Sequence, residues 1–172
     1  MEINGCSFTG HRNIPDGHRR GLEELLKKAV EYAYGLGCRK FYAGGALGFD
    51  TLAAKEVIRF RLSHPDVRLI LLLPCVNQNE LWKDSDTDTY EYVLSVADEI
   101  RYVSESYTKD CMQKRNRLLA EYCDIMIAYV SRARSGAGQT VRMTEKLGKK
   151  VYNLYFSLEN EQGDEESKSD SE

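Results

Sequence analysis

Residues 41–54 read Phe-Tyr-Ala-Gly-Gly-Ala-Leu-Gly-Phe-Asp-Thr-Leu-Ala-Ala, and this stretch decides the fold class. The stretch begins with apolar and aromatic residues, continues with three glycines and ends in an Ala- and Leu-rich pattern. These three parts predict a strand, a tight loop and a helix, in that order. Such a helix start directs free N–H groups and a positive dipole end at the space above the strand, which suits a phosphate. The alternative is a turn whose glycines serve packing alone, because Gly44, Gly45 and Gly48 fall short of the dinucleotide-binding fingerprint.

Strands and helices alternate on both sides of this unit. The run at residues 67–73 is aliphatic on both faces, which is typical of a strand in the middle of a parallel sheet, and Pro74 is expected to end it. Further strands are predicted at residues 3–9, 40–43, 99–103, 124–130 and 151–156. Apolar periodicity predicts helices at residues 22–34, 50–63, 108–122 (with Thr108 as N-cap) and 141–147. The pattern predicts a three-layer α/β domain with a doubly wound, mostly parallel sheet.

Composition fits one soluble domain of 172 residues, with 42% hydrophobic and 30% charged residues. The chain lacks an apolar run of the roughly 18 residues that span a bilayer, and its first residues lack the pattern of a signal peptide. The five cysteines are odd in number and show no C-x-x-C spacing, so we expect reduced thiols in a cytoplasmic protein. No membrane partner is expected.

The net charge of −3 is unevenly distributed. Residues 157–172 carry seven acidic side chains and one lysine, a net charge of −6, which leaves +3 on residues 1–156. We expect residues 1–156 to form the folded domain and residues 157–172 to be a disordered acidic tail, because the tail is poor in apolar residues. A mildly basic core fits a small anionic ligand better than an extended nucleic-acid groove.

Three polar, glycine-containing segments end or follow predicted strands and should therefore meet at one edge of the sheet. They are Thr9-Gly10-His11-Arg12, residues 44–50, and Ser135-Gly136-Ala137-Gly138-Gln139-Thr140. Their convergence is a stronger indication of a ligand site than any one of them.

Two charged residues complete the predicted site. Asp50 falls in the first turn of its helix, where it either faces the ligand or only caps the helix. Arg115 lies on the same helical stripe as Met112 and Leu119, so it points inward and needs an anionic partner. That partner is a ligand or, alternatively, a structural carboxylate such as Asp50 or Asp124.

The segment from residue 75 to residue 97 is less regular. Trp82 could stack on a base, but packing over the sheet edge is the better interpretation. Asp84, Asp86 and Asp88 are spaced as in a calcium loop, but Thr89 and Ser95 stand where glycine and glutamate are required. We therefore predict no metal site, and no cofactor.

The chain resembles the SLOG superfamily, particularly its small YspA/YpsA-like proteins. The resemblance rests on the segments at 9–12, 44–50 and 135–138 and on Arg115-Asn116, and covers residues 3 to about 156. It implies a Rossmann-like fold, a bacterial or phage source, and binding of an ADP-ribose-like molecule or a nucleoside monophosphate, with a homodimer left open. The site residues implied are Thr9, Gly10, His11, Arg12, Gly44, Gly45, Gly48, Asp50, Arg115, Ser135, Gly136, Gly138 and Thr140.

Two branches of the superfamily supply alternatives. Residues 112–116 are similar to the Met-x-x-Arg-Lys helix of the LONELY GUY phosphoribohydrolases, with Asn116 in place of lysine, but residues 141–143 lack the glutamate of that branch. An N-glycoside hydrolase would then use Asp50 and Arg115 as catalytic residues. The Smf/DprA branch implies single-stranded DNA binding, which the small core charge disfavours. We favour a domain that binds a nucleotide-derived small molecule, without nucleic acid.

Overall fold

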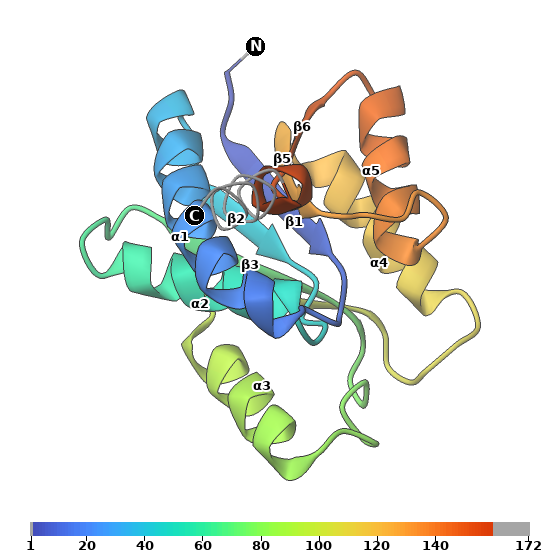
Figure 1. The fold of residues 1–172 in the computed structure, drawn as a ribbon. Helices are drawn as coiled ribbons and strands as arrows, with labels where there is room; N and C mark the ends of the chain where they lie inside the picture. The colour runs from blue at the N-terminus through green and yellow to red at the C-terminus, as the bar shows by residue number, and fades with distance from the viewer. Residues whose placement is uncertain (1, 160–172) are drawn as a thin grey trace, which may run out of the picture.

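The structure, a computed structural model, describes residues 2–159. Strands and helices alternate along these residues (Figure 1). Their bounds are β1 (Gly5–Gly10), α1 (Asp16–Leu36), β2 (Lys40–Ala43), α2 (Phe49–Arg61), β3 (Arg68–Cys75), α3 (Asp84–Val96), β4 (Glu99–Ser104), α4 (Cys111–Tyr122), β5 (Ile125–Tyr129), α5 (Gly136–Lys146) and β6 (Lys150–Asn153). None of the described helices is both long and apolar enough to span a bilayer.

The strands form one sheet in the order β4-β3-β2-β1-β5-β6, and each neighbouring pair is parallel. The chain builds outward from β1 to β4 and then returns to the other side of β1, so the strand order reverses between β1 and β5. Helices α1 and α2 pack together on one face, and α4 and α5 pack together on the other (Figure 1). The predicted three-layer, doubly wound α/β fold is confirmed.

Strand β3 shows why the sheet lies between two helical layers. Leu69, Leu71 and Leu73 belong to the core beneath α1 and α2, whereas Ile70 and Leu72 pack with Leu119 of α4. The two-sided apolar run thus marks a buried strand, as predicted. Pro74 does not end this strand: β2 pairs only as far as Leu71, so the last residues of β3 have β4 as their one partner strand, and a proline is tolerated there.

Several predicted bounds are wrong. The irregular segment contains α3, whose apolar stripe is too thin to reveal it: only Tyr90 and Val93 of that helix are buried. Trp82 packs edge-on against Tyr90, with 5.1 Å between the ring centres, in agreement with the packing interpretation. Asp110, and not Thr108, occupies the N-cap position of α4. The predicted last strand is shorter and ends at Asn153.

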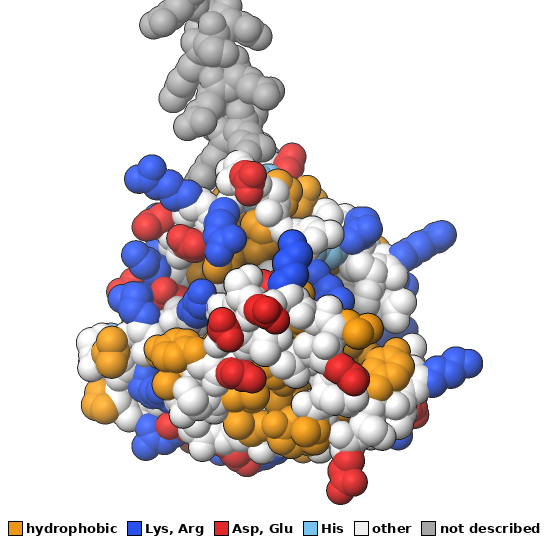
Figure 2. All heavy atoms as spheres, turned by 90° about the horizontal axis from the view of Figure 1, so that it is seen from below, with side chains coloured by type: hydrophobic (Ala, Val, Ile, Leu, Met, Phe, Trp, Pro, Cys, Tyr) orange, Lys and Arg blue, Asp and Glu red, His pale blue; other side chains and the backbone are white. Residues whose placement is uncertain are grey.

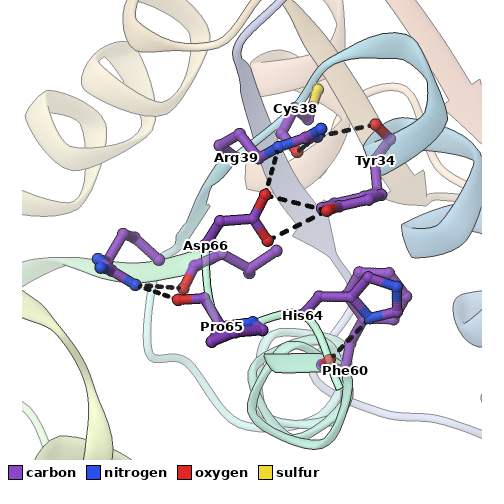
Figure 3. A network of polar contacts seen from close by, with 9 residues as sticks. Tyr34, Cys38, Arg39, Phe60, His64, Pro65 and Asp66 are labelled. Carbon is purple, nitrogen blue, oxygen red and sulfur yellow. Dashed lines mark hydrogen bonds and ion pairs between the residues drawn. The ribbon is translucent and has the colours of Figure 1, made fainter. Parts of the chain in front are cut away.

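At the amino-terminal edge of the sheet, charged side chains pair with other groups of the protein (Figure 3). Asp66 accepts hydrogen bonds from the Tyr34 hydroxyl, the closer at 3.0 Å, and pairs with the Arg39 Nε at 3.0 Å. The guanidinium of Arg39 also lies 3.7 Å from the centre of the Tyr34 ring. At the same edge, Asp124 accepts the N–H groups of Asn4 and Gly5 at 2.9 and 2.8 Å. Asp124 is therefore occupied with the start of β1 and is not the partner of Arg115.

The folded part extends beyond the predicted boundary at residue 156. Residues 155–159 are helical, and Leu158 is only 4% exposed within the main core. Glu159 also lies 3.1 Å from the Nε2 of His18, a buried residue of α1. The expectation of disorder is thus wrong for residues 157–159, because the acidic composition of the segment concealed its one core residue. Residues 160–172 lie outside the described part.

Replacing Leu158 with alanine should lower the free energy of unfolding by about 2–3 kcal/mol, because it leaves a cavity beside α1. The contact is close: a Cβ added to Gly21 would meet the Leu158 side chain at 2.7 Å. Leu81→Ala is the matched control, since Leu81 is 96% exposed and should change stability by less than about 0.5 kcal/mol. Urea denaturation of the full chain measures both variants. Equal midpoints would show that the segment does not contribute to the core.

Candidate functional site

A cleft of about 390 Å³ lies at the carboxyl ends of β1 and β5, where the strand order reverses. Its walls come from the β1–α1 connection, the start of α2, one side of α4 and the first turn of α5. The lining residues are Thr9, Gly10, His11, Arg12, Asn13, Ala46, Asp50, Met112, Arg115, Asn116, Leu119, Arg132, Ser135, Gly136 and Ala137. The predicted meeting of polar segments from distant parts of the chain is thus observed.

Arg115 is a buried cation in the wall of the cleft, with only 6% of its surface exposed. Its Nε donates to the Asn116 Oδ1 at 2.9 Å, and one terminal nitrogen donates to the carbonyl of Gly44. Among the described residues, no carboxylate oxygen lies within the 4.0 Å of an ion pair. Burial lowers the pKa of Arg115, but an arginine stays protonated at neutral pH. The site therefore holds a positive charge without a direct counter-ion.

Asp50 is the acidic group of the cleft and is 5% exposed. Its Oδ2 accepts the N–H of Ala46 at 3.3 Å, so it closes the glycine loop at the start of α2. Burial raises the pKa of Asp50 from 3.8 to about 6, although Arg115, the Ala46 N–H and Arg12 each act to lower it. A carboxyl group with this pKa exchanges a proton near neutral pH.

The end of β1 and the end of β5 contribute the remaining polar groups. The Nε2 of His11 accepts the N–H of Ser131 at 2.8 Å, so this nitrogen carries the lone pair. Burial, and then the charge of Arg132, lower the pKa of His11, and the ring is neutral at pH 7. Arg12 and Arg132 are exposed at the rim of the cleft. The positive charge of the cleft thus comes from three arginines.

The sequence pattern had indicated that the third polar segment is a loop before a helix at residues 141–147. In the structure, α5 begins at Gly136, so this segment forms the first turn of the helix. Ser135 is the N-cap, and its Oγ accepts the N–H of Gly138 at 3.0 Å. Ser135, Gly136 and Ala137 face the cleft, which places the positive end of the α5 dipole at its wall.

Five of the predicted site residues do not line this cleft, and their contacts explain their presence. Gly44 contributes its carbonyl to Arg115. Gly45 and Gly48 have φ of 71° and 79°, and an added Cβ would meet Leu73 at 2.3 Å or the Arg12 carbonyl at 2.1 Å. The backbone at both positions needs a bare Cα for this packing, and Gly48 also lines a second, neighbouring cavity. Two others are buried in α5: Gly138 against the carbonyl groups of the preceding loop, and Thr140 with its hydroxyl bonded to the Gly136 carbonyl.

Two glycine substitutions should separate packing from ligand contact. Gly48→Ala should destabilise the protein by more than about 2 kcal/mol, because a Cβ at that φ collides with backbone. Gly136→Ala should leave the thermal midpoint nearly unchanged, since its Cβ would meet only the Asn116 side chain, at 3.9 Å. Calorimetric melting of both variants tests this contrast, which similar losses of stability would contradict.

Some residues of the cleft escaped the sequence interpretation. Asn13 and Arg132 lie in connections without apolar periodicity, so the hydrophobic pattern does not distinguish them from other loop residues. Ala46, by contrast, falls inside the predicted segment at residues 44–50. One signal was available for Arg132: it follows the strand that ends at the reversal of strand order, where ligand-binding residues gather.

Comparisons with known proteins agree with this architecture. A family model described as the YspA SLOG family matches residues 11–156. Among curated proteins, the uncharacterized SPbeta prophage-derived protein YoqJ of Bacillus subtilis (strain 168) is 28% identical over 148 residues, which cover 78% of this chain and 82% of that protein.

Two solved structures share the fold. DNA processing protein A (DprA) from Streptococcus pneumoniae has a TM-score of 0.62 and 18% identity over 87% of this chain and 49% of its own. DNA processing protein A from Helicobacter pylori, described in terms of a single-stranded DNA binding mode, has a TM-score of 0.61 and 19% identity over 87% of this chain and 64% of its own. The chain thus spans about half of the first protein and less than two thirds of the second.

Proposed function

Since the chain belongs to the YspA SLOG family, we propose that its cleft binds the phosphate and ribose of a nucleotide-derived small molecule, such as a nucleoside monophosphate or an ADP-ribose-like compound. One observation carries the proposal: Arg115 is buried in the cleft wall with no carboxylate of the described residues within 4.0 Å. A buried charge without a direct ion pair is costly. The charge of Asp50 favours the protonated guanidinium without contacting it within 4.0 Å, and a ligand phosphate would supply an anion in contact.

The contrast between the two edges of the sheet supports this proposal. At the amino-terminal edge Arg39 is paired with Asp66 (Figure 3). At the same edge the backbone N–H groups of Asn4 and Gly5 donate to Asp124. At the carboxyl edge Arg115 has carbonyl, amide and thioether acceptors, none of which carries a charge. The fold therefore keeps its positive charge available on the side where doubly wound proteins bind ligands.

The donors of the cleft suit a phosphate. A guanidinium has five N–H groups, and Arg115 uses one for Asn116, one for Gly44 and one in a weak contact with the Met112 sulfur. The remaining donors, together with the first turn of α5, would bind phosphate oxygens. Asp50 would accept a hydrogen bond from a ribose hydroxyl. The cleft volume of about 390 Å³ lies within the usual range of small-molecule sites.

An N-glycoside hydrolase is the second candidate, and the pKa of Asp50 favours it. A carboxyl group that titrates at about 6 can deliver or accept a proton near the glycosidic bond. The glutamate of the phosphoribohydrolase loop is absent, since Val141, Arg142 and Met143 stand there. Release of free adenine from AMP would identify this activity.

The likeness to DprA brings single-stranded DNA as a third candidate, and charge distribution argues against it. On the face drawn in Figure 2, acidic and apolar side chains lie among the Lys and Arg side chains, and residues 1–156 carry a net charge of only +3. A strand-binding groove needs a continuous basic track with stacking aromatics.

Calorimetric titration of the full chain with AMP, ADP-ribose and a dT oligonucleotide, at low and high salt, tests the proposal. Binding of a nucleotide with a shallow salt dependence and no release of base supports it. Preferential binding of the oligonucleotide, with an affinity that falls steeply as salt rises, would refute it in favour of a DNA-binding function.

A further inference from the structure

A second cavity, of about 410 Å³, lies directly beside the cleft. It is bounded by the β1–α1 connection and α1, by the glycine loop and α2, and by the first turns of α3. Arg12 and Asn13 line both the cleft and the second cavity, so these two residues form the border between them.

The border is held in place by backbone packing. The N–H of Phe49 donates to the carbonyl of His11 at 3.1 Å, and a Cβ on Gly48 would meet the Arg12 carbonyl at 2.1 Å. The β1–α1 connection is therefore pressed against the start of α2. Arg12 lies on this ridge, with the cleft on one side and the second cavity on the other.

The second cavity has a surplus of positive charge. Arg12, Arg19 and Lys55 face it, against one carboxylate, Asp86. Arg19 lies 3.6 Å from Glu23, whereas no ion pair within 4.0 Å engages Arg12 or Lys55 among the described residues. The side chains of Ile14, Leu47 and Leu52 provide an apolar wall. Cations beside an apolar wall suit a phosphate attached to a sugar and a ring.

We infer that this cavity binds the second unit of a two-unit ligand whose halves are joined by a pyrophosphate, with Arg12 at the linker. The inference rests on the proposed function, because the first unit would occupy the cleft of Arg115. A mononucleotide fills only the cleft, whereas a pyrophosphate-linked compound crosses the ridge and reaches Lys55. The second cavity would then set the selectivity between the two classes of ligand.

The test compares AMP and ADP-ribose as probes in calorimetric titrations of the full chain. Lys55→Glu removes a cation and adds a repulsive charge, so it should weaken ADP-ribose about ten-fold and change the affinity for AMP less than about two-fold. Lys28→Glu is the matched control: it makes the same charge change on the exposed surface of α1, outside the cleft and the second cavity, and should affect neither probe.

The outcomes separate this inference from the proposed function. If wild-type protein binds AMP and Lys55→Glu weakens both probes equally, or neither, the second cavity is not a subsite while the cleft stands. If wild-type protein binds neither probe, both proposals fail. A phosphodiester-linked dinucleotide is titrated as a third probe. If Lys55→Glu weakens its binding and leaves that of ADP-ribose unchanged, the pyrophosphate assignment is overturned in favour of a nucleic-acid strand.

Discussion

Replacing Arg115 with methionine should weaken AMP binding about ten- to a hundred-fold, because a charge-assisted contact of about 1.5–3 kcal/mol disappears. Methionine keeps most of the apolar stem of arginine, so the packing of α4 at this position is largely retained. Arg115→Lys should also weaken binding, since an ammonium group cannot offer the planar, bidentate donors of a guanidinium. Calorimetric titration at pH 7.5 measures the three affinities.

The rival explanation is a structural role, in which Arg115 serves the fold through Gly44 and through the charge of Asp50. Measuring stability at pH 5 reduces this role to the Gly44 contact, because Asp50, with its pKa of about 6, is then mostly neutral in the folded protein. We expect Arg115→Met to stay within about 1 kcal/mol of wild type at that pH, since the buried cation has no paired carboxylate to lose. A loss of several kcal/mol with intact AMP affinity would assign Arg115 to the fold and not to the ligand.

Asp50→Asn should make the unliganded protein more stable at pH 8, by about 2–3 kcal/mol. The folded protein holds the pKa of this carboxyl at about 6 by burial, whereas the unfolded chain ionises it at its ordinary value of 3.8. Between these two values the folded state carries more protons than the unfolded state. Stability attributable to Asp50 is therefore lost as the pH rises from about 4 to 6, and asparagine removes that loss.

The pH dependence supplies the control within the same variant. At pH 4 the folded and unfolded states both hold much of the proton, so the advantage of Asp50→Asn should largely vanish. Asp88→Asn, on the exposed face of α3, should show neither the gain nor its pH dependence. Urea unfolding between pH 4 and 8 gives all three curves, and a constant difference across this range would contradict the assignment. The asparagine variant should also bind AMP more weakly, which is the signature of a group kept for function at the expense of stability.

Much of the fold could be predicted because its signals are local. The aliphatic run of β3 requires cover on both faces, and alternation of strands with periodic helices leaves few arrangements other than a doubly wound sheet. The resemblance to SLOG proteins, drawn from four short motifs, is confirmed by the family match over residues 11–156. Helix α3 could not be predicted from periodicity, since only two of its residues are buried.

The location of the site could be predicted, but the sequence could not show which of its residues face the cleft and which only pack behind it. Parallel strands bring their carboxyl ends to one edge, so the meeting of residues 9–12 with the start of α5 follows from topology. Whether a glycine faces a ligand or a neighbouring backbone depends on tertiary contacts. Gly48 illustrates this, because its need for a bare Cα comes from the Arg12 carbonyl 36 residues earlier. The buried position of Leu158 was equally invisible in an acidic context.

A crystal structure of the full chain grown with AMP tests the central claim most directly. The account predicts a phosphate within hydrogen-bond distance of the Arg115 guanidinium and of the first turn of α5, with the ribose beside Asp50. A nucleotide bound elsewhere on the protein, with Arg115 still bonded only to Gly44 and Asn116 and the cleft free of phosphate, would contradict it.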